Sequence, residues 1–186
     1  MRSPFAAWVT ARATTRRARA AVTAMRCEPD AADAEWLADV AAGGDVDHAR
    51  WELRYARAVM GQLVAERDLL DDASISAVAR AMVASIEDDP HVAVDRGDLA
   101  RAQYADRLRA YREAFQARGG MAPSAELLGR CLLAFASDGA RTAGAPLAYA
   151  VELVARYEEE AGRHLRAAFG EAHLPEDLPP SALAGR

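Results

Sequence analysis

Pairs of histidine and glutamate are the residues whose spacing comes closest to a metal site. The sequence holds two pairs separated by four positions, which is one helical turn: His48 with Glu52, and Glu160 with His164. Two imidazoles and two carboxylates facing one another could hold a divalent cation. However, the usual motif in bundles is Glu-x-x-His, with a spacing of three. In an up-down bundle the two pairs would also lie about 25–30 Å apart, because a helix rises about 1.5 Å per residue. Local pairing of each histidine with its own glutamate is the simpler hypothesis.

Large aromatic rings provide a second candidate site. Four of them fall on helix faces that should point inward: Trp51, Tyr55, Tyr111 and Tyr157. Rings inside a bundle can enclose an apolar ligand or cofactor, but rings at helical spacing also build an ordinary core. Both interpretations stay open, and in the first one the His–Glu pairs would supply the polar groups of the pocket.

The two cysteines rule out a disulfide scaffold and give little sign of nucleophilic catalysis. Cys131 lies in a very apolar segment, where burial makes a thiol inert, whereas Cys27 follows a basic segment and is the better candidate for a thiolate. No histidine is near Cys27 in the sequence. The nucleophile elbow, the phosphate-binding loop, the dinucleotide fingerprint and the Cys-x-x-Cys pair are all absent. We therefore predict no catalytic residue and no cofactor, and an enzyme is not the favoured interpretation.

Carboxylates are concentrated at residues 87–89, just before Pro90 and His91. The preceding residues have a helical pattern, and acids at the C-terminal end of a helix oppose the helix dipole. The cluster therefore indicates a partner arginine. A cation site that uses His91 is the alternative.

Charge is distributed very unevenly. Residues 1–27 contain six arginines and no acid, whereas the rest of the chain contains 17 arginines and 28 acids. Four of the six are spaced by 4, 3 and 7 and should form one stripe on a helix: Arg12, Arg16, Arg19 and Arg26. We predict that these four contact anionic groups and that Phe5 and Trp8 act as apolar anchors.

Several anionic partners could bind this basic segment. Nucleic acid would use the arginines on phosphates, but the acidic remainder would repel it. A membrane surface is possible through residues 1–27 but is not favoured, because the apolar face is only about two turns long. An organelle-targeting segment would have a similar composition. We favour binding to acidic protein surface, either on the same chain, on a second copy or on a partner protein.

The composition predicts an all-α fold. The chain has 46 alanines, only two isoleucines, and arginine as its sole basic residue besides four histidines. Arginine in place of every lysine, together with this much alanine, is typical of a GC-rich bacterial genome. The pattern predicts seven helices, at residues 3–27, 31–42, 47–70, 73–87, 94–118, 124–135 and 146–170. Asp47 should begin the third helix and Ser124 should cap the sixth. The third helix should pack against another helix through a seam of residues spaced 4-3-4-3-4-3: Ala49, Leu53, Ala56, Met60, Leu63, Arg67 and Leu70. The sixth is apolar nearly all round, so we expect it at the centre.

These patterns predict an up-down bundle of five helices over residues 47–170. A basic helical arm and a short helix at 1–46 precede it, and an extended proline-containing tail at 171–186 follows. No apolar run reaches the ~18 residues needed to span a bilayer, and no resemblance to a known family is evident. The sequence predicts a non-enzymatic interaction or assembly module of a bacterial cytoplasm. The alternative is a helical bundle that binds a small molecule or cofactor.

Overall fold

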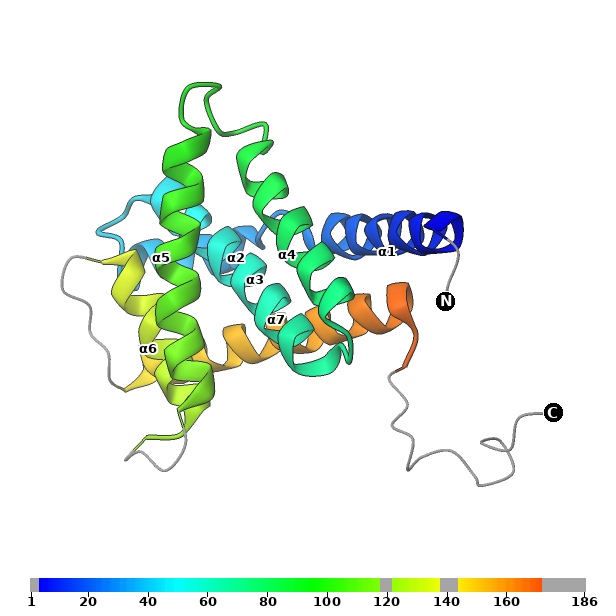
Figure 1. The fold of residues 1–186 in the computed structure, drawn as a ribbon. Helices are drawn as coiled ribbons and strands as arrows, with labels where there is room; N and C mark the ends of the chain where they lie inside the picture. The colour runs from blue at the N-terminus through cyan, green and yellow to red at the C-terminus, as the bar shows by residue number, and fades with distance from the viewer. Residues whose placement is uncertain (1–3, 118–121, 138–143, 172–186) are drawn as a thin grey trace.

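The computed structural model describes residues 4–117, 122–137 and 144–171, with side chains from Trp8 onward. Seven helices and no strand occur in these ranges, which confirms the all-α prediction. The helices are α1 (Pro4–Met25), α2 (Ala31–Val40), α3 (Val46–Asp68), α4 (Asp72–Glu87), α5 (Gly97–Gln116), α6 (Ser124–Ala136) and α7 (Ala145–Phe169). Figure 1 shows α4 and α5 side by side, with α7 running across below them and α1 extending away from α4 to the right.

Aspartates at the starts of helices explain several of the observed boundaries. The carboxylate of Asp30 accepts a hydrogen bond from the backbone N–H of Ala32 and so begins α2. Asp45, not Asp47, caps α3, and Asp71 caps α4 by accepting from the N–H of Ser74 at 2.8 Å. No side chain caps α6, so the prediction for Ser124 was wrong; this helix follows Pro123, whose fixed φ directs the chain into its first turn.

Helix α3 lies at the centre of the fold. Among the described helices it contacts each of the other six, and its residues 58–65 are all buried. The predicted seam is buried from Ala49 to Leu63, whereas its last two residues, Arg67 and Leu70, are exposed. The prediction of a central α6 was wrong. That helix exposes Arg130, which pairs with Glu126 at 2.6 Å on its outer side.

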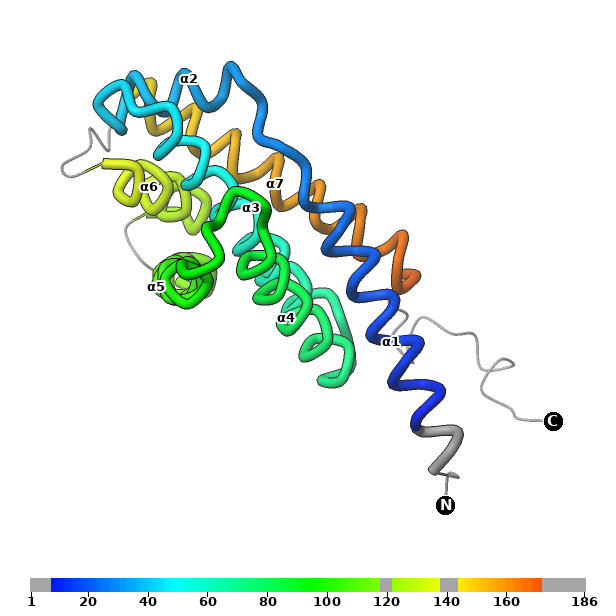
Figure 2. The backbone as a smooth tube through the Cα atoms, turned by 90° about the horizontal axis from the view of Figure 1, so that it is seen from above, coloured from blue at the N-terminus to red at the C-terminus, as the bar shows by residue number. Residues whose placement is uncertain are grey.

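Helix α1 belongs to two environments. Its C-terminal half buries four small or apolar residues against α4 and α7: Ala18, Ala21, Val22 and Met25. Burial of Val22 and Met25 contributes about 1.5–3 kcal/mol each. Its N-terminal turns extend past the ends of α4 and α7 (Figure 2). Part of the segment predicted as a basic arm is therefore core, and part is surface.

Candidate functional site

The exposed half of α1 carries the predicted basic stripe. Trp8, Arg12, Arg16 and Arg19 follow one another at spacings of 4, 4 and 3, so they lie along one side of the helix. All four are exposed, and the Arg12 guanidinium lies 4.4 Å from the centre of the Trp8 ring. We call these four residues the basic stripe. Phe5, the other predicted anchor, lies outside the described side chains.

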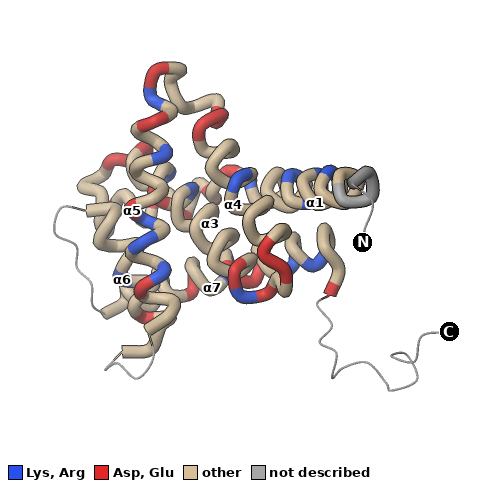
Figure 3. The backbone as a smooth tube through the Cα atoms, in the orientation of Figure 1, with Lys and Arg blue, Asp and Glu red and all other residues tan. Residues whose placement is uncertain are grey.

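No acid of the described chain forms an ion pair with the arginines of the basic stripe. Figure 3 shows the corresponding turns of α1 with arginines along them and no acidic residue. Arg17, which lies on the other side of α1, is also exposed and unpaired within the described residues. Because the exposed guanidinium groups of the basic stripe form no ion pair within the described residues, this side of α1 is attractive to an anionic surface.

Arg26 does not belong to this surface. Its guanidinium pairs with Asp89 at 3.1 Å, and the side chain of Asp89 is only 13% exposed. The acidic cluster at the end of α4 thus has the arginine partner that the sequence indicated. Glu87 in the same cluster meets Arg101 of α5 at 3.2 Å. One predicted contact residue therefore fixes α1 to the fold.

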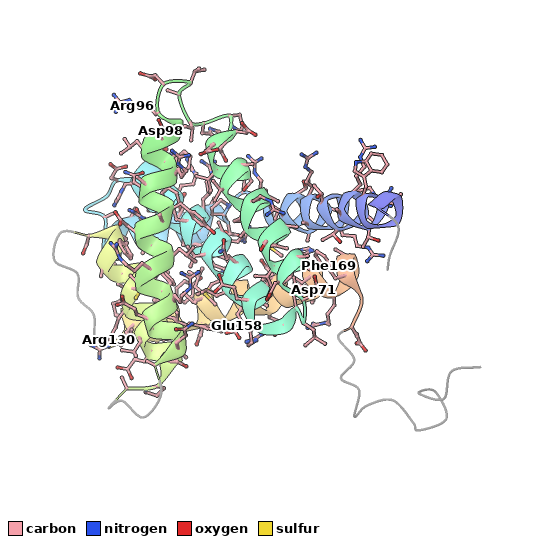
Figure 4. The ribbon with its side chains drawn as sticks, in the orientation of Figure 1. Asp71, Arg96, Asp98, Arg130, Glu158 and Phe169 are labelled. Atoms are coloured by element: carbon pink, nitrogen blue, oxygen red, sulfur yellow. The ribbon has the colours of Figure 1, made fainter. Side chains whose placement is uncertain are left out.

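Acidic residues gather at the turn between α3 and α4 and on the adjacent face of α7. Arg67 pairs with Asp68 at 2.6 Å and with Glu158, which joins α3 to α7. These two hydrogen bonds raise the pKa of Arg67. We call the carboxylates at this turn and on α7 beside Arg67's partner the acidic patch: Asp68, Asp71, Asp72, Glu158 and Glu159. Asp71 and Glu158 are labelled in Figure 4. Two of these carboxylates, Asp68 and Glu158, pair with Arg67, and the other three form no ion pair within the described residues, so the patch carries excess negative charge.

The residues predicted as metal ligands have other partners. Glu52 is 3% exposed and receives hydrogen bonds from Arg107 of α5, one of them at 2.9 Å from Nε. Glu160 meets Arg57 of α3 at 3.5 Å. His48 and His164 are half-buried and form no ion pair with these glutamates. Within the described ranges no three His, Cys, Asp or Glu side chains are close enough to hold a metal ion.

The four predicted pocket aromatics occupy different environments. Tyr55, Tyr111 and Tyr157 are at most 3% exposed, and burial raises the pKa of each. Tyr111 stacks on Phe135 with ring centres 6.2 Å apart. Only Trp51 of the four lines the pocket beneath the α1–α2 connection, where its ring centre lies 5.7 Å from that of Tyr55. The other three serve as core.

That same pocket contains residues that the sequence indicated separately or not at all. Cys27 and His91 lie in it together, although 64 positions separate them. Arg54 and Arg57 of α3 also line it and were not predicted. For Arg54 the available signal was its spacing from Trp51, since positions 51, 54 and 58 lie on one side of a helix.

Comparison with known proteins adds no functional assignment. No family model, curated protein or solved structure matches the chain. None of the described helices combines the length and the apolar character that a membrane span requires. Any function must therefore be argued from the surfaces and the pocket themselves.

Proposed function

We propose that this chain is a non-enzymatic assembly module of a bacterial cytoplasm, in which the basic stripe of one copy binds the acidic patch of another. The observation that carries the proposal is the basic stripe itself: the guanidinium groups of Arg12, Arg16 and Arg19 are exposed on one side of α1 and have no acidic partner in the described part of their own chain. The rest of the sequence has an excess of 11 acids over arginines, so every other copy offers a complementary surface.

The arrangement of α1 supports this proposal. Its buried half holds the helix against α4 and α7, and Arg26 fixes its end to Asp89. The stripe is thereby presented on a helix that is already folded, which lowers the entropic cost of association. Trp8 adds a large, rigid apolar surface beside the charges, and it is 53% exposed.

A contact between two different patches is heterologous. Repeated head-to-tail contacts of this kind produce a ring when the rotation between copies closes and an open chain when it does not. Alternatively, two copies related by a twofold axis can form the contact twice and make a closed dimer. The assembly should therefore contain two or more copies and depend on protein concentration. It should also depend on salt, since screening shortens the range of exposed charges from about 10 Å at 0.1 M to about 3 Å at 1 M salt.

The experiment is sedimentation velocity of the purified chain at several concentrations, in 50 mM and in 500 mM NaCl. We expect larger species at low salt that dissociate at high salt. A triple variant, Arg12→Gln with Arg16→Gln and Arg19→Gln, should weaken association about 10- to 150-fold, because each contact contributes about 0.5–1 kcal/mol. Each member keeps a long polar side chain on an exposed position, so the fold should survive.

A matched control removes the same charge elsewhere. Arg17, Arg80 and Arg163 are exposed and have no ion pair within the described chain, so replacing all three by Gln changes the net charge equally. This control should associate within about 3-fold of the unmodified chain. A chain that stays monomeric at 50 mM NaCl, or a control that weakens as much as the stripe variant, would refute the proposal. Binding of DNA or anionic vesicles by monomers would favour those partners instead.

A further inference from the structure

A pocket of about 210 Å³ lies beneath the connection between α1 and α2. Its floor is apolar and consists of Met25, Ala58, Met82 and Ile86, all at most 8% exposed. For comparison, a dry cavity of about 150 Å³ holds benzene. The pocket therefore has room for a compact apolar group about the size of one six-membered ring with a short substituent.

Arginines give the upper part of the pocket its charge. Arg26, Arg54 and Arg57 line it, against two lining carboxylates, Glu28 and Asp89. Arg57 is held from several sides: it donates to the carbonyl oxygen and to Sγ of Cys27, both at 2.8 Å, and its guanidinium lies over the buried Tyr157 ring at 4.6 Å.

Arg54 is the group whose present partner can be replaced most easily. Its side chain is only 11% exposed and lies over the Trp51 ring at 4.9 Å, so the guanidinium is fixed. Its Nη2 donates to both carboxylate oxygens of Glu28 at 2.7 Å. The Glu28 side chain, in contrast, is 64% exposed. An ion pair with so exposed a member contributes about 0.2–1 kcal/mol, so another carboxylate could displace Glu28.

We propose that this pocket binds a small organic monocarboxylate with an apolar body. The carboxylate takes the position of the Glu28 side chain on Arg54, and the apolar body lies on Met25, Met82 and Ile86. The chain itself demonstrates the first contact, because Arg54 already holds a carboxylate there. The floor supplies what the Glu28 side chain does not use, namely buried apolar surface.

The test uses benzoate as the probe and benzamide as its uncharged match, with sodium chloride added to equalise ionic strength. Direct binding is measured by saturation-transfer NMR. Occupancy of the pocket is measured by the rate at which iodoacetamide alkylates Cys27, followed by peptide mass spectrometry. Cys131 is an internal control, because it lies on α6 and burial raises its pKa to about 11.

We expect benzoate to slow alkylation of Cys27 at least 3-fold and to leave Cys131 unchanged, while benzamide has no effect at the same concentration. Arg54→Gln should abolish the protection. Glu28→Gln should lower the benzoate concentration needed for half-protection about 1.5- to 5-fold, because the internal competitor is gone. This second variant keeps Arg54 and changes an exposed side chain, so it tests the proposal even if Arg54→Gln does not fold.

Absence of saturation transfer to benzoate would overturn the inference. Equal protection by benzamide would also overturn it, as would weaker benzoate binding by the Glu28→Gln variant. The basic stripe lies outside the pocket, so its triple variant should bind benzoate as the unmodified chain does. Failure of the assembly proposal and failure of this one are thus separate results.

Discussion

Replacement of Arg107 by methionine should destabilise the fold strongly. The carboxylate of Glu52 is 3% exposed and has Arg107 as its ion-pair partner, so the variant leaves a buried charge without compensation. Such a change costs about 3–5 kcal/mol. Arg107 also donates to the carbonyl oxygen of Gln103 and lies within 5 Å of two ring centres, those of Tyr55 and Phe135. Methionine retains part of this packing, so the main loss is the charge partner.

The assay is urea unfolding followed by circular dichroism. With a slope of about 2 kcal/mol per molar urea, the midpoint should fall by about 1.5–2.5 M. Arg109→Met is the matched control two positions further along α5. Arg109 is 71% exposed and pairs with Asp106 on the surface, so its replacement should cost at most about 0.5 kcal/mol.

A double variant separates the buried pair from the rest of the site. Glu52→Leu combined with Arg107→Met removes both charges and places apolar groups where the ions were, which should bring stability back to within about 1 kcal/mol of the unmodified chain. The two single changes should therefore be coupled by at least about 2 kcal/mol. A cost below about 1 kcal/mol for Arg107→Met, or strictly additive effects, would refute the assignment of Glu52 as a buried structural anion.

Two further predictions test the packing of α6 and the buried tyrosines. Gly129→Ala should cost about 1–3 kcal/mol by thermal unfolding, because the new Cβ would lie 2.9 Å from Cγ2 of Val151 and 3.1 Å from the backbone nitrogen of the same residue. Gly162→Ala is the control: its nearest neighbour is the flexible guanidinium of Arg166, so it should be neutral or stabilising by up to about 1 kcal/mol. Burial raises the pKa of Tyr55 to about 12. The unfolded chain loses that proton near pH 10 and the folded chain near pH 12, so about 1–1.5 kcal/mol of the stability present below pH 10 should be lost by pH 11. In urea titrations at pH 8 and 11, Tyr55→Phe should lose less stability than the parent, and an equal loss in both would contradict the prediction.

Helix positions were readable from the sequence because their signals are local. Asp30 before the second helix and Pro146 in the first turn of the seventh each affect the backbone within one turn. The seam from Ala49 to Leu63 predicted the buried face of α3 correctly for the same reason, since its period is that of the helix itself.

The sequence did not predict which helix lies at the centre of the fold, because that depends on how many other helices pack around it. Helix α6 has more apolar residues per turn, yet α3 is the helix that contacts all the other described helices. The approach of helices to α3 depends on small residues such as Ala56, Gly61 and Ala65, which a scale of apolarity ranks low. Its polar Gln62 is also buried, because it accepts a hydrogen bond from the Tyr104 hydroxyl at 2.9 Å.

Polar partners were misassigned because the sequence shows only neighbours on the same helix. His48 is one turn from Glu52, but the actual partner of Glu52 is on α5, 55 positions away. Glu160 likewise pairs with Arg57 rather than with His164. A guanidinium outcompetes a neutral imidazole for a carboxylate because it always carries a full charge and five donors. In a chain with 23 arginines, carboxylates on inward-facing helix positions therefore pair with arginine rather than with histidine.

The two environments of α1 decide how the assembly proposal can be tested. Deleting residues 1–27 would remove the stripe, but it would also take Ala18, Val22 and Met25 from the core and release Asp89 from Arg26. Loss of association after such a deletion would not distinguish a missing contact from a damaged fold. Substituting the exposed guanidinium groups separates the two, because the buried positions of the same helix stay unchanged. The three exposed arginines that mark α1 as a binding surface are therefore also the smallest set of residues whose replacement tests the assembly proposal.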